Sequence, residues 1–256
     1  MAQTIPFLGS GAIGKALARL AVANDFEVVM SNSRGPDTLA GLVADLGDHA
    51  RAATAADAAR AGDLVVATVP LSAYRELPAD ALAAKIVIDT MNYYPERDGQ
   101  MAELEVGDVT SSELLQQHLA SSRVVKALHN LDYQRLFVSA RPSGSVDRSA
   151  LPIAGDDAEA KAEVTRFMDA IGYDAVDTGL LADSWRCQPQ TPVYVWPYIG
   201  DPPEGMTEQQ ARQWFLESNV AVSAEHVRRL LDAAVPGGPI GGSYAKVPPG
   251  AAPVSP

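Results

Sequence analysis

Residues 5–14 read IPFLGSGAIG, a short apolar run followed by a Gly-x-Gly-x-x-Gly pattern that opens an Ala-rich segment. Strand, glycine turn and helix in this order predict a dinucleotide-binding turn, whereas a turn without a ligand is the less favoured interpretation. The first glycine permits the tight turn, the second admits a pyrophosphate and the third lets the helix pack closely on the strand. The residues predicted to hold the pyrophosphate are Gly9, Ser10, Gly11, Ala12, Ile13 and Gly14.

The residues that follow the second apolar run indicate which nucleotide is preferred. NAD-binding domains place Asp or Glu about twenty residues past the glycines, against the ribose hydroxyls. Here the chain reads Asn32-Ser33-Arg34 instead. A serine hydroxyl and a guanidinium group can both donate to a 2'-phosphate, which a carboxylate would repel. The sequence therefore predicts NADP(H), with Asn32, Ser33 and Arg34 as its 2'-side residues, although Arg34 as a solvated loop residue stays an alternative.

Apolar runs alternate with Ala-rich helical segments as far as about residue 180, which is typical of parallel strands joined by helices. We expect an α/β, Rossmann-type, doubly wound and mostly parallel sheet over residues 1–180. The expected strands are 5–8, 27–30, 64–68, 86–89, 124–127, 151–154 and 173–177, and the expected helices are 13–23, 37–46, 54–59, 73–77, 112–119 and 158–171.

The pattern changes near residue 181, where aromatic residues and prolines crowd together in 184–203. Thr207 and Gln210 form a capping-box pair that predicts a helix to about residue 219, and a second helix is expected over 223–234. Residues 235–256 are dominated by Pro, Gly and Ala, which predicts a flexible tail, attached to a partner subunit through Ile240 and Tyr244. Residues 181–256 are therefore expected to be a smaller, mainly helical region for acceptor binding or dimerisation.

Polar residues follow three of the expected strands, at the sheet edge where ligands bind in this fold. Thr68, Val69 and Pro70 are predicted to contact the cofactor, and Asn92 is predicted to hold the carboxamide or the acceptor. His129 could orient the substrate or donate a proton, although a loop histidine is more often structural. His129 and Asn92 are the candidate catalytic residues.

The bulk composition excludes several other functions. The 256 residues carry a net charge of -12 without a run of Lys or Arg, which disfavours nucleic acid and anionic membranes as partners. Cys187 is the only cysteine and the four histidines are scattered, so neither a disulfide nor a metal site is expected. The chain has no uninterrupted apolar stretch of about 18 residues and no leader-like start. We expect a soluble, cytoplasmic homodimer that acts on a small-molecule hydride acceptor.

These motifs together resemble the coenzyme F420-dependent NADP oxidoreductases over roughly residues 3–195. The resemblance rests on 9–14, 32–34, 69–70, the Val-Val-Lys-Ala-Leu-His-Asn block at 124–130 and the Ile-Ala-Gly-Asp-Asp block at 153–157. It implies hydride exchange between NADPH and the deazaflavin F420 as co-substrate, by alignment of two stacked rings. It also implies cofactor contacts at Ser10, Ala12, Ile13, Ser33, Arg34 and Pro70, and a place for His129 beside the deazaflavin.

The chain departs from this family in the Met91-Asn92-Tyr93-Tyr94 loop and in its C-terminal part, both expected on the acceptor side. An NADPH-dependent reductase of another flavin, a carbonyl or an imine therefore stays open, as does a non-catalytic NADP-binding protein.

Overall fold

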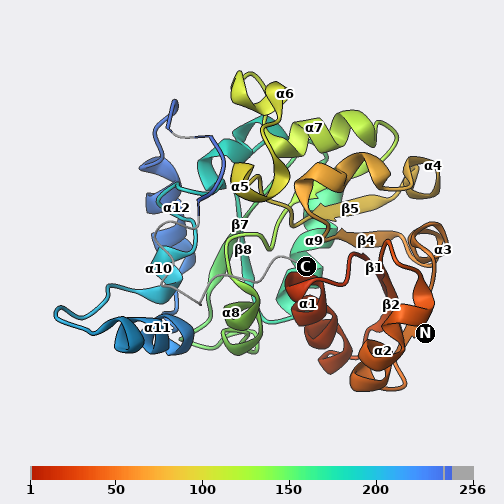
Figure 1. Ribbon diagram of the computed structural model, residues 1–256, viewed down its shortest axis with the longest axis horizontal. Coiled ribbons are helices and arrows are strands. Elements are labelled where there is room, and N and C mark those ends of the chain that lie inside the picture. The colour runs from red at the N-terminus through yellow and green to blue at the C-terminus, as the bar shows by residue number, and fades with distance from the viewer. Residues whose placement is uncertain (1, 239, 244–256) are drawn as a thin grey trace.

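The computed structural model describes residues 2–238 and 240–243, so Tyr244 of the predicted tail lies outside the described residues. In chain order the strands are β1 (Thr4–Leu8), β2 (Glu27–Ser31), β3 (Ala50–Ala52), β4 (Leu64–Ala67), β5 (Ile86–Asp89), β6 (Arg123–Lys126), β7 (Ala150–Gly155) and β8 (Asp174–Asp177). They form one sheet in the order β3-β2-β1-β4-β5-β6-β7-β8 (Figure 1). All neighbouring strands are parallel except β6 and β7, which confirms the predicted Rossmann-type, mostly parallel sheet.

Helices cover both faces of this sheet. They are α1 (Ala12–Ala23), α2 (Ala40–Leu46), α3 (Ala55–Arg60), α4 (Ala79–Leu82), α5 (Pro95–Asp98), α6 (Ala102–Glu105), α7 (Ser111–His118), α8 (Tyr133–Val138), α9 (Ala158–Ala170), α10 (Trp196–Ile199), α11 (Glu208–Glu217) and α12 (Ala224–Asp232). The described residues also form the 3₁₀ helices η1 (Pro36–Leu39), η2 (Leu71–Glu76) and η3 (Leu181–Cys187).

Successive residues of the central strands enter two separate cores. Ile5 and Phe7 belong to the core that includes residues of α1, α9 and α12, whereas Leu8 belongs to a second core that includes residues of α3, η2 and α7. The alternation follows from the period of two along a strand. Because both faces are buried, these strands read as continuous apolar runs, which is why the sequence marks them clearly.

Pro6 lies inside β1, the central strand, where a proline removes one ladder hydrogen bond. The strand pairs with β2 from Thr4 onward but with β4 only from Phe7. A Cβ on Gly62 would lie 2.8 Å from the Pro6 ring, so this glycine makes room for the proline. Strand β1 thus accommodates Pro6 before its pairing with β4 begins.

Most predicted elements agree with the structure within one or two residues, but some were missed. The predictions omitted β3, α8 and the short helices α4, α5, α6 and α10, and merged η1 with α2. Strand β3 consists of Ala50, Arg51 and Ala52, none of them fully buried, so it lacks the apolar signal of the other strands. Among the described residues, no helix combines the length and the apolar character that a membrane span needs.

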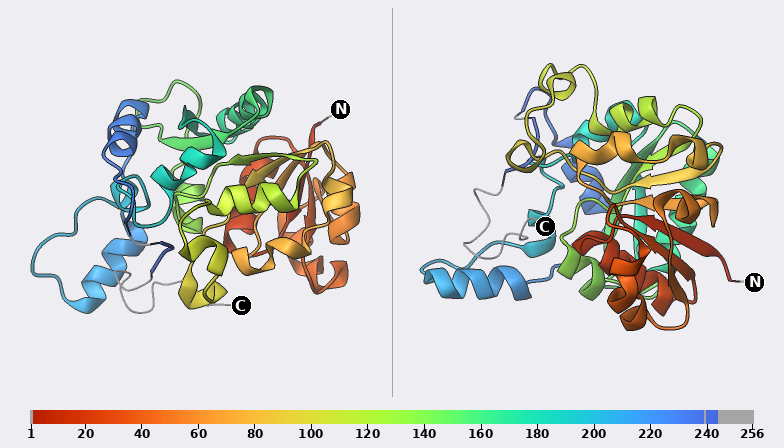
Figure 2. Two further views of the ribbon diagram at one scale, coloured as in Figure 1. Left: turned by 90° about the horizontal axis from the view of Figure 1, so that it is seen from above. Right: turned by 45° about the vertical axis from the view of Figure 1, so that its right-hand side comes forward.

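After β8, the described residues form the 3₁₀ helix η3 and the helices α10, α11 and α12 beside the sheet. Thr207 caps α11 and exchanges hydrogen bonds with Gln210, as the sequence predicts. Helix α8 contacts α1 and its Arg135 bonds the main chain of α11, so α8 joins the first helix to the C-terminal region (Figure 1). Both views of Figure 2 place α11 at the periphery of the molecule. The division into domains near residue 181 stays a prediction.

Candidate cofactor and acceptor site

A cavity of about 940 Å³ opens at the carboxyl ends of β1, β4 and β5. The chain turns in opposite directions from β1 to its neighbours β2 and β4, and ligands of such sheets bind where this reversal occurs. The cavity is lined by most of the predicted site residues, namely Gly9, Ser10, Gly11, Ala12, Ile13, Asn32, Ser33, Arg34, Thr68, Val69, Pro70, Asn92 and His129. Gly14 does not line it, because its Cβ position faces Gly9 and the hydroxyl of Thr68.

The three glycines of the turn have different surroundings. Gly9 has φ +117°, and a Cβ there would lie 2.6 Å from the carbonyl oxygen of Thr68. A Cβ on Gly14 would lie 2.5 Å from the carbonyl oxygen of Gly9, so α1 packs directly on the turn. No atom lies within 4 Å of a Cβ built on Gly11, which borders open space at the start of α1. This open space beside unbonded first-turn N–H groups fits a pyrophosphate.

Thr68 ties the end of β4 to the glycine turn. Its backbone N–H donates to Leu8 O over 2.8 Å and its hydroxyl donates to Gly9 O over 2.9 Å. Two neighbouring strand ends are thereby fixed at the point where the cavity begins. Thr68 thus contributes to the shape of the turn in addition to lining the cavity.

The loop after β2 is ordered by Asn32. The Asn32 amide donates to Thr38 Oγ1 over 2.9 Å, and Asn32 Oδ1 accepts the backbone N–H of Arg34 over 3.0 Å. Ser33 and Arg34 are exposed on the cavity wall. Within the described part of the chain, no carboxylate forms an ion pair with the Arg34 guanidinium, which lines the cavity and could donate to a 2'-phosphate. Asn32 therefore positions the loop, whereas Ser33 and Arg34 present the donors.

A buried ion pair that the sequence reasoning missed lies beneath the loop after β5. The Nζ atom of Lys126 is 3.3 Å from Asp89 Oδ2, both side chains are fully buried, and Lys126 also donates to Met91 O. Asp89 accepts the Met91 N–H over 2.9 Å and the Ser112 hydroxyl over 2.7 Å. The sequence signal that could have revealed this pair is a lysine and an aspartate at the ends of two apolar runs. The pair holds the loop that carries Asn92.

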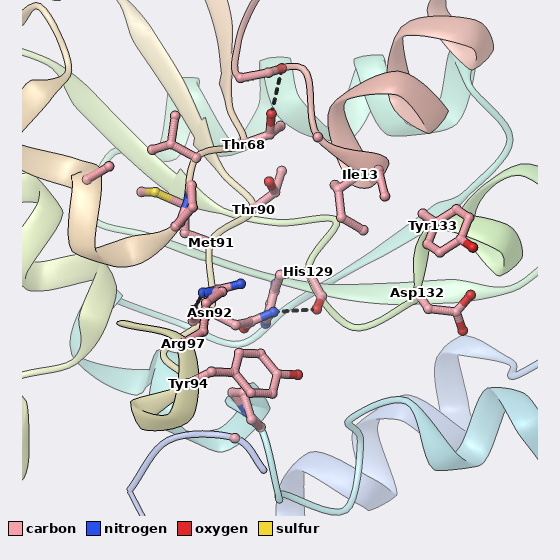
Figure 3. A pocket seen from close by; sticks show the side chains of 18 of the residues that line it. Ile13, Thr68, Thr90, Met91, Asn92, Tyr94, Arg97, His129, Asp132 and Tyr133 are labelled. Carbon is pink, nitrogen blue, oxygen red and sulfur yellow. Dashed lines mark hydrogen bonds between the residues drawn. The ribbon is translucent and has the colours of Figure 1, made fainter. Parts of the chain in front are cut away.

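Asn92 and His129 lie side by side, as predicted for two neighbouring strand ends. Asn92 Nδ2 donates to the main-chain carbonyl of His129 over 2.9 Å, drawn as a dashed line in Figure 3. The Oδ1 atom of Asn92 is buried and makes no hydrogen bond within the described residues. A nicotinamide carboxamide could supply the missing donor.

The imidazole of His129 is better suited to a structural role than to proton donation. Its Nε2 lies 3.0 Å from the carbonyl oxygen of Cys187, and only 2% of the residue is exposed. Burial, and secondarily the charge of Lys126, lower the pKa of His129 well below its ordinary value. The ring is therefore neutral near pH 7. A catalytic role for His129 stays a prediction, but this geometry supports positioning through its backbone.

The far side of the cavity is aromatic. It includes Tyr94, Tyr133, Tyr194, Trp196 and Phe215, which come from four separate segments. Figure 3 shows Tyr94, Tyr133, Ile13 and His129 around one space. Tyr93, in contrast, is 4% exposed, and its hydroxyl donates to Glu105 and lies 3.2 Å from Gly99 O, so it packs inside the protein and does not line the cavity.

Residues 240–243, at the start of the predicted tail, are in contact with the site. The N–H of Gly242 donates to Tyr93 O over 2.7 Å, and Ser243 Oγ donates to Glu96 over 2.8 Å. Gln190 donates to Gly241 O over 2.5 Å. Gly242 and Ser243 also line the cavity. This part of the predicted tail therefore forms a wall of the site.

The comparison with protein families concerns the N-terminal part of the chain, where nucleotide binding is predicted. Residues 4–93 match the family described as NADP oxidoreductase, coenzyme F420-dependent. The likeness covers residues 4–93, about a third of the chain. The resemblance seen in the sequence is confirmed over this range, and NADP-linked oxidoreduction is the activity by which the matched family is described.

Similar proteins extend the comparison beyond residue 93. The metalloreductase STEAP3 of Rattus norvegicus is 30% identical over 185 residues, which cover 72% of this chain and 35% of the relative. Protein YjhV of Escherichia coli is 39% identical over 64 residues, 25% of this chain and 43% of that relative. The chain thus spans less than half the length of these two relatives.

Two solved structures match over most of their own length. A hypothetical protein from Sinorhizobium meliloti has a TM-score of 0.67 and 27% identity, covering 77% of this chain and 94% of the other. A protein from Arthrobacter sp. FB24 assigned as an F420-dependent NADP reductase has a TM-score of 0.59 and 24% identity, covering 72% and 87%. The second likeness, at this identity, supports the fold alone.

Proposed function

We propose that this protein is an NADP(H)-dependent oxidoreductase that transfers hydride between NADPH and a planar acceptor of the deazaflavin type, coenzyme F420. The observation that carries the proposal is one continuous cavity, which runs from the glycine turn and Arg34 to the aromatic side chains of Tyr94, Tyr194 and Trp196. A nucleotide and a second flat ring can occupy such a cavity together.

The cofactor end is argued from the chain's own donors. The α1 N-terminus and the open space beside Gly11 would hold the pyrophosphate, and Ser33 and Arg34 would hold the 2'-phosphate. Asn92 Oδ1 would accept from the carboxamide. The bound nucleotide supplies the hydride, while the protein supplies alignment and excludes water.

The acceptor end is less specific in its chemistry. Aromatic rings suit a flat heterocycle, and stacking would align it with the nicotinamide. The hydroxyl and amide groups of Tyr94, Tyr194 and Asn92 also suit a carbonyl or an imine. These groups favour, as a second candidate function, an NADPH-dependent reductase of another flavin, a carbonyl or an imine.

The test is anaerobic mixing of the protein with NADPH and oxidised F420, followed by the deazaflavin absorbance. We expect bleaching that requires NADPH and that slows sharply for Arg34→Gln. Parallel reactions with FMN and with a cyclic imine measure the second candidate. NADPH binding without bleaching of F420, but with reduction of FMN or the imine, would replace the first candidate by the second. Binding without turnover on any of them would refute both.

A further inference from the structure

Three polar side chains from distant segments meet on the acceptor side of the cavity. The hydroxyl oxygens of Tyr94 and Tyr194 lie 2.6 Å apart, although 100 residues separate them in the chain. Asn92 Nδ2 donates to the Tyr194 hydroxyl over 3.2 Å. All three residues line the cavity, and Figure 3 shows the Tyr94 ring directed into it. Tyr94 and Tyr194 are not among the residues proposed above to hold the nucleotide, whereas Asn92 lies between the nucleotide side and these two tyrosines.

The backbone beside Tyr194 is strained. Val195 has φ +59° and ψ -59°, which a β-branched residue rarely adopts, and Trp196 N donates to Tyr194 O over 2.7 Å to close a tight turn. A second bond, from Val195 N to Asn130 O over 3.0 Å, ties this turn to the loop of His129. Strained turns persist where the surrounding structure fixes them, and they concentrate at functional sites. The hydrogen bonds around this turn therefore hold Tyr194 in place.

Two titratable groups near the loop after β5, His129 and Lys126, are poorly suited to donate a proton. The His129 ring is directed to Cys187 O and its pKa is lowered by burial. Lys126 is fully buried and paired with Asp89. The Tyr94 and Tyr194 hydroxyls each carry a proton and are hydrogen-bonded to one another within the cavity wall.

We propose that the hydroxyls of Tyr94 and Tyr194, positioned by Asn92, bind the polar edge of the hydride acceptor and supply the proton that its reduction requires. This inference rests on the proposed function. The acceptor class is a ring or a double bond whose reduction places negative charge on a nitrogen or carbonyl oxygen.

The proposed step is balanced as follows. Tyr194 gives its hydroxyl proton to the nitrogen or oxygen atom that becomes negative when hydride, with its electron pair, arrives from the C4–H bond of the nicotinamide. Tyr94 then returns a proton to the Tyr194 phenolate and is itself re-protonated by water. The products are the oxidised nucleotide and the acceptor carrying one added hydride and one added proton.

The experiment compares Tyr194→Phe and Tyr94→Phe with the matched control Tyr93→Phe. Tyr93 is the neighbouring tyrosine, and its hydroxyl is directed away from the cavity toward Glu105. Two measurements use the protein without turnover: the Kd of NADPH from nicotinamide fluorescence, and the Kd of oxidised F420 or FMN from quenching of protein fluorescence. Two others use turnover: kcat with each acceptor, and the solvent deuterium isotope effect on kcat.

For Tyr194→Phe we expect kcat to fall by about 10²-fold or more and the solvent isotope effect to disappear. The Kd of the oxidised acceptor should rise about three- to tenfold, as for loss of one hydrogen bond. The Kd of NADPH should stay within twofold of wild type. Tyr94→Phe should show a smaller fall in kcat, because Tyr194 keeps its proton, and Tyr93→Phe should keep the isotope effect.

Two results would overturn this inference but not the proposed function. One is an unchanged kcat and an unchanged acceptor Kd in Tyr194→Phe. The other is an equal loss of NADPH binding and acceptor binding, which would mean that Tyr194 acts only through the fold. Inert wild-type protein that binds NADPH would instead refute the proposed function. In that case the acceptor Kd of Tyr194→Phe still decides the binding part of the inference.

Discussion

Lys126 and Asp89 form an ion pair with 3.3 Å between Nζ and Oδ2 and no exposed surface on either side chain. Removing one member of such a pair leaves an uncompensated charge in the interior. We expect Lys126→Met to lower the free energy of unfolding by about 3–5 kcal/mol, measured by urea denaturation. The free energy of unfolding should fall less in the double variant Lys126→Met, Asp89→Asn than in the single variant, because neither buried charge then remains. Equal losses in the two proteins would contradict this explanation.

Arg34 should determine the choice between NADPH and NADH. A hydrogen bond to a charged group contributes about 1.5–3 kcal/mol, so Arg34→Gln should weaken NADPH binding about ten- to a hundredfold. NADH binding should change little, because NADH has no 2'-phosphate. Equilibrium titrations of both nucleotides provide the measurement. The control is Arg60→Gln, an exposed arginine on α3 that pairs with Asp57 and does not line the cavity. Equal weakening of both nucleotides by Arg34→Gln would refute the prediction.

Gly242 should be required for the acceptor side of the site. A Cβ at this position would lie 2.2 Å from Cε1 of Tyr94, so Gly242→Ala has to displace either the Tyr94 ring or the chain at 240–243. We expect kcat to fall about tenfold or more, as for a reacting group moved by about 1 Å, while the Kd of NADPH stays unchanged. Gly238→Ala is the control, since no atom lies within 4 Å of its built Cβ. Wild-type kcat in Gly242→Ala would show that the contact is dispensable.

His129 should make the protein less stable in acid. Its pKa is lowered in the folded state, so below about pH 6.5 the unfolded chain binds a proton that the folded chain does not. The free energy of unfolding therefore keeps its full value, as far as His129 is concerned, above about pH 6.5. It decreases as the pH falls below that value, by up to about 1.4 kcal/mol per pH unit. Unfolding measured between pH 7.5 and 5.5 should show a shallower slope for His129→Gln than for wild type.

The control for this pH dependence is His49→Gln. His49 is exposed, and its hydrogen bond to Glu27 raises its pKa, so its contribution has the opposite sign. His49→Gln should therefore not reduce the acid destabilisation. Identical slopes for wild type and His129→Gln would show that another group is responsible.

The sequence was most informative where local pattern and tertiary environment agree. The glycine turn and strands β1, β4 and β5 were predicted because their residues are apolar on both faces or require an unusual backbone conformation. The edge strand β3 was not predicted, because Ala50–Ala52 is short and partly exposed. Local pattern thus identifies the interior of the sheet better than its edge.

The acceptor side could not be predicted to the same degree, because its residues meet only after folding. Tyr94 and Tyr194 are 100 residues apart, and nothing in either local sequence indicates the other. Gly241 and Gly242 were read as part of a tail from their composition, whereas close packing on Tyr93 and Tyr94 explains why glycine stands there. Asn92 and His129 were placed correctly at the sheet edge, but the direction of the His129 ring depends on Cys187.

The cavity walls draw on separate parts of the chain. The nucleotide end uses segments before residue 79, whereas the aromatic end uses residues 92–97, 131–134, 189–196, 215 and 242–243. Substitutions in the later segments can therefore alter what is reduced while leaving the nucleotide preference intact. Such a division makes the scaffold suitable for directed evolution toward new acceptors. In each round, binding of NADPH would select the variants whose nucleotide-binding segments are still folded.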